Sequence, residues 1–224
     1  MELEEVMRTT FAARDFTDEP LPDAVLYRIL DQARFAPSGG NRQGQRVIIV
    51  KNAKTRDAIA RLAEPAAQKY IAQMKAGENP WNTVVPSKVT QAEIEATPVP
   101  DMLLEPYKKA AVVLVFAVDL AVLAAMDQHL NRVGIIGGAS IYPLVWNVLL
   151  AARNAGYGGT ITTLPAASEP ELQKLLDVPK TYAICAVVPL GKPVKQITRL
   201  SRKPVESFTT RETFGGEPFT ADAS

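Results

Sequence analysis

The chain has 224 residues, of which 47% are hydrophobic, and this is enough to enclose the core of one moderate domain or two small ones. A formal net charge of +1 offers no basic footprint for nucleic acid or for an anionic membrane surface. The single cysteine, Cys185, excludes an internal disulfide framework, and its place in an apolar run indicates a buried, unreactive thiol.

The N-terminal segment is acidic and lacks the apolar core of a signal peptide. The longest clean apolar run, residues 110–118, is far shorter than the roughly 20 residues that cross a bilayer. We therefore expect a soluble, cytoplasmic protein that binds neither a membrane nor a nucleic acid.

The first predicted elements are a helix, a turn and a strand. Apolar residues at helical spacing begin after Pro22 and continue to Ala33. The stretch APSGGNRQGQRVIIV (36–50) then joins a turn of small and amide-bearing residues to a buried strand at 47–50. An Ala-rich second helix is expected over residues 53–76.

Five prolines interrupt the segment 77–106, and its apolar residues Trp81 and Met102 follow no clear period. About thirty residues without a regular pattern are typical of a functional lid or of a partly mobile segment. An ordered surface excursion is the alternative interpretation.

The second half of the chain supplies the remaining core elements. Residues 111–118 are continuously apolar, which predicts a strand buried on both faces. Residues 138–155 predict a helix that is apolar almost all round and lies at the centre of the fold or in a subunit interface. We further predict a β-prone segment at 160–164, a helix to Leu176 with a Ser168–Glu171 capping box, and a strand at 182–190. The sum is an α+β chain in which helices cover a small sheet.

The residues that several active-site chemistries need are missing from the sequence. One histidine and one cysteine cannot form a zinc or iron site, so we expect no metal. His129 lies on an Ala-rich segment, and the chain lacks the nucleophile elbow of a Ser-His-Asp hydrolase. Gly134, Gly137 and Gly138 have the wrong spacing and position for a dinucleotide-binding loop.

The remaining inventory of amides, hydroxyls and a few arginines suits flavin mononucleotide (FMN). Arginine pairs two phosphate oxygens at once, and Asn and Gln match the alternating donors and acceptors of the flavin's pyrimidine edge. The N5 atom of the flavin needs a donor such as a threonine hydroxyl or a backbone NH.

Three blocks of sequence resemble the nitroreductase superfamily of FMN-dependent oxidoreductases. They occur in the family's order over most of the chain, and they read RDFTDEPLP…ILDQARFAPSGGNRQGQRVIIV, NVLLAARNAGYGGTITTLP and VVPLGKP…LSRKP. The motifs TITT (160–163) and SRKP (201–204) are most similar to the branch that holds the iodotyrosine deiodinases and the flavin-destroying enzyme of cobalamin synthesis.

The resemblance implies an α+β fold, a nitroreductase-like three-layer sandwich with a small mixed sheet covered by helices. It also implies an interleaved homodimer with two FMN sites at its interface, which would account for the apolar helix at 138–155. Residues 1–224 would form a single domain, with 77–106 as a lid or substrate-region excursion and 191–224 as an extended C-terminal arm that embraces the partner subunit.

The resemblance assigns site residues by position. Arg14 would lie beside the flavin phosphate or the N1 edge, and the turn 37–43 would contact the flavin. Thr162 and Thr163 would face N5 and are the catalytic candidates, and residues 202–203 would clamp the phosphate. The cofactor-binding candidates are Arg14, Pro37, Ser38, Gly39, Asn41, Gln43, Thr162, Thr163, Arg202 and Lys203.

Each set of candidates also has a plain structural interpretation. Ser38 and Asn41 would merely shape and cap a turn, residues 162–163 would merely form a strand, and Arg202 would be a solvated tail residue. The joint occurrence of all three sets in the family's order favours the flavin site.

The sequence departs from the family pattern near the expected site. Residues 10–12 replace the usual Arg-Arg-Ser, so the phosphate would depend more on Arg202 or on Arg8. Gly44 and Gln45 replace the usual Pro-Trp, which makes Gln45 a candidate for substrate choice.

Two further substrate candidates, Tyr70 and Trp81, lie in or near the lid region. The deiodinases grip an amino-acid zwitterion with an acidic, an aromatic and a basic residue. Glu64, Tyr70 and Lys75 offer the same residue types, but the lid region does not clearly reproduce that grip.

These features favour an FMN-dependent oxidoreductase that takes a hydride from NAD(P)H in ping-pong fashion and reduces a small aromatic, nitro, quinone or enone acceptor. Reductive dehalogenation or oxygen-dependent flavin chemistry on the same fold is an alternative. A non-catalytic flavin store or sensor dimer is an alternative of a different class.

Overall fold

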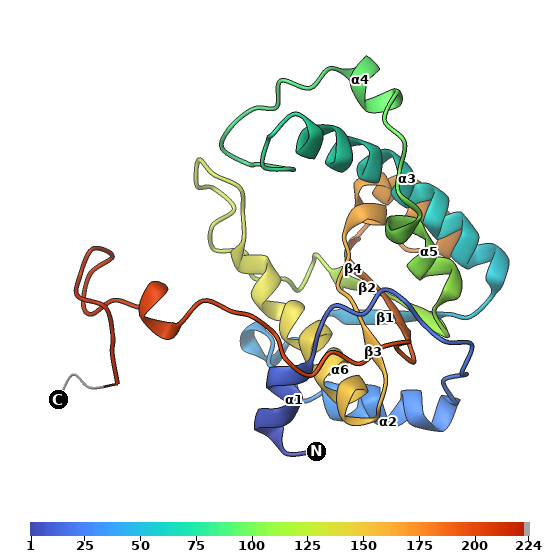
Figure 1. Ribbon diagram of the computed structural model, residues 1–224, viewed down its shortest axis with the longest axis horizontal. Coiled ribbons are helices and arrows are strands. Elements are labelled where there is room, and N and C mark those ends of the chain that lie inside the picture. Colours follow the sequence, from blue (N-terminus) through green and yellow to red (C-terminus); the bar gives the residue numbers. More distant parts are fainter. Residues whose placement is uncertain (222–224) are drawn as a thin grey trace.

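The computed structural model describes residues 1–221, which form three layers around a four-stranded sheet (Figure 1). The strands are β1 (Gln45–Val50), β2 (Val112–Asp119), β3 (Gly158–Gly159) and β4 (Tyr182–Gly191). They pair antiparallel in the order β1-β2-β4-β3. The mixed character expected of the sheet is limited, among the described residues, to one isolated parallel bridge between Ala12 and Gly159.

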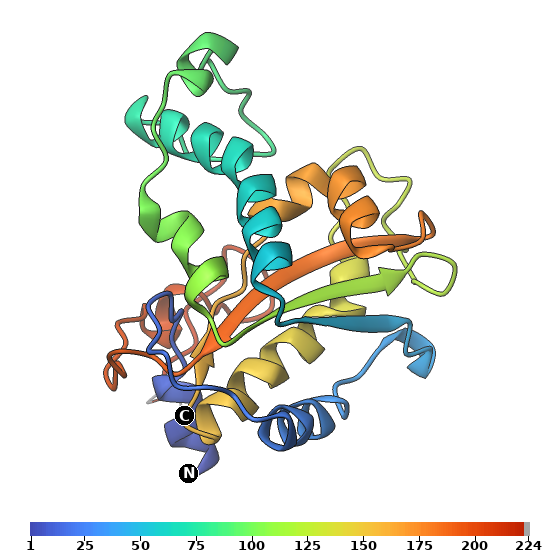
Figure 2. The ribbon, with the colours of Figure 1, turned by 90° about the vertical axis from the view of Figure 1, so that its right-hand side faces the viewer.

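Helices cover both faces of the sheet (Figure 2). α3, α5 and α7 lie on one face and α2 and α6 on the other, with α1 against α6 and the short α4 near the end of α3. The helices are α1 (Leu3–Thr9), α2 (Asp23–Ala33), α3 (Ala53–Lys75), α4 (Gln91–Glu95), α5 (Asp101–Lys109), α6 (Tyr142–Asn154) and α7 (Glu169–Leu176). The predicted α+β sandwich is confirmed. None of the helices in residues 1–221 combines the length and the apolar character that crossing a membrane requires.

Strand β2 divides the core into two halves. Leu114 and Phe116 point toward α2 and α6, whereas Val113 and Val115 point toward α3, α5 and α7. Because successive side chains of a strand face opposite sides, a strand covered on both sides must be apolar throughout. Cys185 packs at the edge of this core, and burial raises the pKa of its thiol to about 11, so the thiol stays protonated.

Helix α6 is buried on one side only. Val145, Val148 and Ala152 are completely buried against α2 and the sheet. Tyr142 and Trp146 on the same helix are each 42% exposed. The helix therefore lies in the core, as expected, and also leaves large aromatic side chains uncovered by this chain.

The predicted capping box of Ser168 and Glu171 is wrong. Ser168 closes a 3₁₀ turn (Leu164–Ser168), and its hydroxyl donates to the Leu62 carbonyl at 3.0 Å instead of accepting from α7. A capping box does form at α4, where Thr90 accepts from the Glu93 amide and Glu93 accepts from the Thr90 amide. Tertiary contact with α3 thus takes the hydroxyl that the local pattern assigned to a cap.

The segment 77–106 is more regular than its sequence indicated, because it contains α4 and the first two turns of α5. Pro100 occupies the N-cap of α5, and α5 packs along α3. The irregular part of the loop is tied to itself through Glu78, which accepts hydrogen bonds from Ser87 Oγ (2.6 Å) and the Lys88 amide (2.7 Å).

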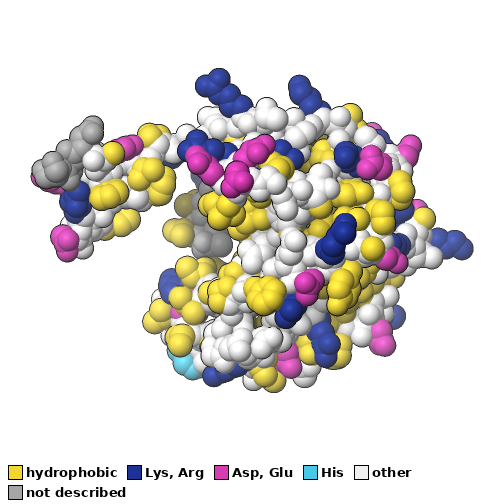
Figure 3. Space-filling view, turned by 90° about the horizontal axis from the view of Figure 1, so that it is seen from below, with side chains coloured by type: hydrophobic (Ala, Val, Ile, Leu, Met, Phe, Trp, Pro, Cys, Tyr) yellow, Lys and Arg dark blue, Asp and Glu magenta, His cyan; other side chains and the backbone are white. Residues whose placement is uncertain are grey.

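After β4 the chain leaves the body as an arm that runs to residue 221 (Figure 1). Its one regular piece among the described residues is a 3₁₀ turn (Val205–Ser207), and its aromatic residues Phe208, Phe214 and Phe219 are exposed. The last three residues of the predicted arm, 222–224, lie outside the described residues. Figure 3 shows hydrophobic side chains on the underside of the body and on the arm that stands away from it.

Replacing Gly159 with alanine tests the close packing at the edge of β4. An alanine Cβ would lie 2.6 Å from the backbone oxygen of Pro189, so one strand would have to move. We expect the free energy of unfolding to fall by about 1–3 kcal/mol, measured by chemical denaturation. Gly215→Ala is the matched control, because within residues 1–221 no atom beyond its chain neighbours lies within 4 Å of its added Cβ. Equal stability of the two variants would contradict this account.

Candidate active site

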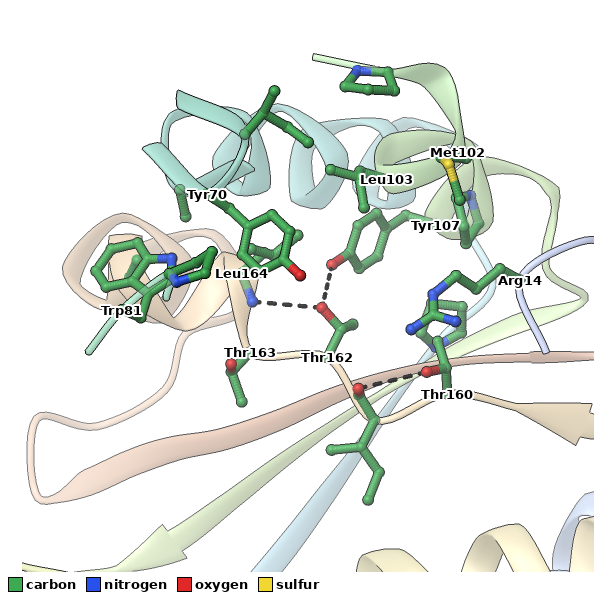
Figure 4. Close-up of a pocket in the computed structure, with 18 of the residues that line it drawn as sticks. Arg14, Tyr70, Trp81, Met102, Leu103, Tyr107, Thr160, Thr162, Thr163 and Leu164 are labelled. Atoms are coloured by element: carbon green, nitrogen blue, oxygen red, sulfur yellow. Dashed lines mark hydrogen bonds between the residues drawn. The ribbon is translucent and has the colours of Figure 1, made fainter. Parts of the chain in front are cut away.

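A cavity of about 750 Å³ lies between α3, α5 and the segment 160–164 (Figure 4). The loop that follows α3 closes one end of it, and Arg14 borders another. The volume lies within the range of small-molecule binding sites, and most of the lining is apolar.

Backbone pairing with β4 fixes the segment 160–164. The Thr162 amide donates to the Val187 carbonyl at 3.0 Å, and the Val187 amide donates to the Thr162 carbonyl at 2.8 Å. In the same register Thr160 lies opposite Pro189, which has no amide hydrogen to donate, so the predicted β-prone segment is reduced to a single bridge. Because both backbone groups of Thr162 are paired, this residue offers a ligand its hydroxyl and not its NH.

The Thr162 hydroxyl is oriented by Tyr107 of α5, which is 1% exposed. The two hydroxyl oxygens are 3.0 Å apart, and the Leu164 amide donates to Thr162 Oγ1 at 3.4 Å. Burial raises the pKa of the Tyr107 phenol above its usual range, so the phenol keeps its proton. A buried phenol that donates to Thr162 leaves the threonine proton free to point into the cavity.

Arg14 reaches the cavity because its neighbours are held in place. The Ala13 amide donates to the Gly159 carbonyl at 3.0 Å, and Phe16 forms a bridge with Pro193. The guanidinium of Arg14 makes one long bond, 3.3 Å, to the Ala12 carbonyl. In residues 1–221 no carboxylate pairs with Arg14, so its donors are available to an anionic group.

The turn that carries Pro37, Ser38, Gly39, Asn41 and Gln43 does not line the cavity. It precedes β1 and is fastened to the segment before α6 by the Gly39 amide, which donates to Ser140 Oγ at 3.0 Å. Ser38 shapes the turn, because its hydroxyl accepts from the Gln43 amide at 3.0 Å. Asn41 and Gln43 adopt left-handed backbone angles, with φ of 53° and 50°.

Gln45 also lies away from the cavity of its own chain. It is the first residue of β1 and is paired with Val118, at the opposite end of β2 from Val112. Its Oε1 is buried and has no hydrogen-bond partner within the described part of the chain. A buried acceptor without a partner is costly and rare, which marks this end of the sheet as unusual.

Tyr70 and Trp81 both line the cavity. Trp81 has a left-handed backbone (φ 55°), and its amide donates to Oε1 of the buried Gln73 at 3.1 Å. Lys69 Nζ lies 4.4 Å from the centre of the Trp81 ring, a cation–π contact. These two contacts hold Trp81 against the end of α3.

The other candidates fall into two groups. Thr163 lines the cavity beside Thr162, and its carbonyl accepts from the Ala166 amide at 3.0 Å. Arg202 and Lys203 lie exposed on the arm, and the Arg202 guanidinium bonds only to the carbonyl of Ser201 among the described residues. A single copy of the chain thus brings Arg14, residues 162–163, Tyr70 and Trp81 together, and leaves the turn and the arm elsewhere.

Sequence reasoning missed Tyr107 and the α5 wall of the cavity, which includes Met102 and Leu103. The signal was present: Pro100 and Asp101 begin a helix, and Leu103 and Tyr107 are spaced four residues apart. Pro100 before the helix and Pro106 inside it obscured the helical pattern. Within residues 1–221 no three His, Cys, Asp or Glu side chains come together as a metal site.

Two proteins of known activity are similar to this chain in sequence. Iodotyrosine deiodinase of Nematostella vectensis is 23% identical over 207 residues, which are 90% of this chain and 72% of that protein. An FMN reductase (NAD(P)H) of Bacillus subtilis is 25% identical over 207 residues, 90% of this chain and 70% of that one.

Solved structures share the fold. Oxidised iodotyrosine deiodinase bound to FMN and 3-iodo-L-tyrosine matches with a TM-score of 0.68 and 22% identity, over 95% of this chain and all of that one. The NADPH:FMN oxidoreductase of Vibrio harveyi complexed with NAD⁺ matches with a TM-score of 0.67 and 20% identity, over 95% and 77% of the two chains. The family model described as nitroreductase family matches residues 7–192, which include both walls of the cavity. The chain belongs to the nitroreductase family.

Proposed function

We propose that the protein is an FMN-dependent oxidoreductase that uses NAD(P)H to reduce a small aromatic, nitro, quinone or enone acceptor. The observation that carries the proposal is the convergence of an oriented hydroxyl, Thr162, and an unpaired cation, Arg14, on one largely apolar cavity (Figure 4). Membership of the nitroreductase family and the flavin-binding relatives support it.

The residues present suit a flavin. A flat apolar ring needs an apolar slot, which α3 and α5 provide, and its polar edge needs donors and a positive charge. Thr162 would donate to N5, and Arg14 would stabilise negative charge on the ring edge or on the phosphate. When bound, FMN supplies the two-electron carrier between the nicotinamide and the acceptor.

One chain supplies only part of this site, because the turn 37–43 and residues 202–203 lie away from the cavity. We propose that a second copy of the chain contributes its turn. The exposed Tyr142 and Trp146 of α6 and the exposed aromatic residues of the arm provide apolar surface for such a homodimer. The buried, unpartnered Oε1 of Gln45 lies near the same turn.

The reaction balances without any further reagent. For a quinone, NAD(P)H and one proton are consumed, and oxidised nicotinamide and hydroquinone are released. The protein's part is to exclude water, to orient the reactants and to hold the Thr162 hydroxyl in the cavity through its hydrogen bond with Tyr107. The deiodinase relatives make reductive dehalogenation the second candidate.

Anaerobic reduction tests the proposal directly. The purified protein, loaded with FMN, should lose its visible flavin absorbance when NADH or NADPH is added, and the absorbance should return with a quinone. Protein that stays yellow with both nicotinamides would show a flavin store or sensor instead of a reductase.

Mixed dimers test whether the turn acts on the partner's cavity. We expect Arg14→Gln and Asn41→Gly homodimers to bind FMN at least about tenfold more weakly, since each loses a hydrogen-bonding group. Glycine suits the left-handed backbone of residue 41, so the fold should persist. A heterodimer of the two variants should keep one intact site and bind half the flavin of the wild type. A heterodimer that binds none would place the turn and Arg14 of the same chain at one site.

The Tyr107→Phe variant tests the direction of the Thr162 proton. Loss of the phenol frees a lone pair of Thr162, which then can accept a hydrogen bond from a reduced flavin, so the midpoint potential should rise by on the order of 20 mV. Tyr70→Phe is the matched control, because the Tyr70 hydroxyl also faces the cavity but makes no hydrogen bond within residues 1–221. The double variant with Thr162→Val should match Thr162→Val alone. An unchanged potential in Tyr107→Phe would remove Tyr107 from this role.

A further inference from the structure

The outer part of the cavity is an apolar compartment between two helices. Ile71 and Met74 of α3 line it together with Met102 and Leu103 of α5. Trp81 closes the end opposite Arg14 (Figure 4). Tyr70 is the polar side chain that reaches into it from α3. We call the part of the cavity that these residues line the outer compartment. The inner part is the one that Arg14 and Thr162 line.

Helix geometry decides which residues of α3 reach this compartment. Ala66 and Met74 lie four residues before and after Tyr70, so the three share one face of the helix, and all three line the cavity. Glu64 and Lys75 lie six residues before and five residues after Tyr70, on other faces. Both are exposed, and neither lines the cavity. The acidic and basic residues that resembled a zwitterion grip are therefore turned away from it.

The charge around the cavity has one sign. Arg14 is the single charged side chain among the residues that line it in the described chain, and Lys69 stands behind the Trp81 ring. The acidic residue of the nearby loop, Glu78, does not line the cavity, and its carboxylate accepts hydrogen bonds from Ser87 and the Lys88 amide. An ammonium group entering the compartment would meet no carboxylate among the described lining residues, and the Arg14 guanidinium would repel it.

We propose that the outer compartment selects an uncharged aromatic acceptor, such as a neutral quinone or nitroarene, and rejects aromatic amino acids and other acceptors that carry an ammonium group. This inference rests on the proposed function, because the acceptor is reduced at the same site. It separates this chain in substrate class from its relative that was solved with 3-iodo-L-tyrosine, an amino acid.

Three nitroarenes test the proposal by binding alone: 4-nitrotoluene, 4-nitrobenzylammonium, which is nearly the same size and adds the ammonium group, and 4-nitrophenylalanine, which adds the whole amino-acid group. The chain has two tryptophans, so the Trp146→Phe variant leaves Trp81 as the sole reporter in the compartment. Quenching of its fluorescence should give a Kd for the neutral compound at least about tenfold lower than for the other two. The Trp81→Phe variant, which keeps Trp146 outside the cavity, should show no saturable quenching. Equal or tighter binding of either ammonium compound would overturn the proposal.

A charge reversal in the compartment gives the complementary test. Met74 faces the cavity yet is 52% exposed, so Met74→Glu places a carboxylate there without burying it completely. We expect this variant to bind 4-nitrobenzylammonium about tenfold more tightly than the wild type and to bind 4-nitrotoluene no better. Ala76→Glu adds the same charge two residues away, outside this cavity, and should leave the order of affinities unchanged. Wild-type selectivity in Met74→Glu would contradict the charge argument.

The two proposals fail separately. Binding is measured on the oxidised holoenzyme without nicotinamide, whereas the oxidoreductase proposal depends on loss of flavin absorbance with NAD(P)H. A neutral preference without bleaching would overturn the oxidoreductase and support the compartment. Bleaching with no preference among the three nitroarenes would support the oxidoreductase and overturn the selectivity of the outer compartment.

Discussion

The site depends on the two hydrogen bonds that join Thr162 to Val187 at the edge of β4. β4 is held on its other side by β2, and β2 is buried on both faces by the helix layers, so the position of Val187 is fixed by the centre of the core. Pro189 interrupts the pairing between Gly159 and Thr162 because it has no amide hydrogen. The interruption frees the backbone around residue 160, and the bridge at Thr162 then returns the chain to the sheet with its side chain in the cavity.

The N-terminal segment is attached to the same short strand. Ala12 pairs with Gly159, which precedes Thr162 by three residues. Arg14 therefore enters the cavity from a backbone that is fixed close to Thr162. Sheet pairing therefore fixes the backbone positions from which both side chains enter the cavity, and the Arg14 side chain is further held by its bond to the Ala12 carbonyl. Preorganisation of this kind is what electrostatic stabilisation of a developing charge requires. Tyr107 adds the last constraint, since its hydroxyl forms a hydrogen bond with the Thr162 hydroxyl at 3.0 Å and holds that side chain in the cavity.

The sequence predicted the elements whose hydrophobic pattern is strong, namely α2, α3, α6, β2 and β4, with bounds close to those observed. It missed α5, because Pro100 before this nine-residue helix and Pro106 inside it outweigh a weak helical period. It assigned Ser168 to a cap, because a local pattern carries no information about the Leu62 carbonyl that takes the hydroxyl. Resemblance gathered the turn, the threonines and Arg202 into one site, but residue order along a chain does not say whether one copy of the chain brings them together.

The distribution of positive charge indicates which cations a second copy of the chain would supply to the flavin site. A bound flavin nucleotide presents two anionic places, the phosphate and the reduced ring, and Arg14 is the one cation that lines the described cavity. A second cation must therefore come from outside its walls. Arg202 and Lys203 lie on an arm whose exposed aromatic residues need a surface to cover them, and the family match ends at residue 192, before that arm. If the arm packs its aromatic residues on a neighbouring copy, it also brings Arg202 and Lys203 to that copy. The same contact would then bury apolar surface and supply cations for the phosphate.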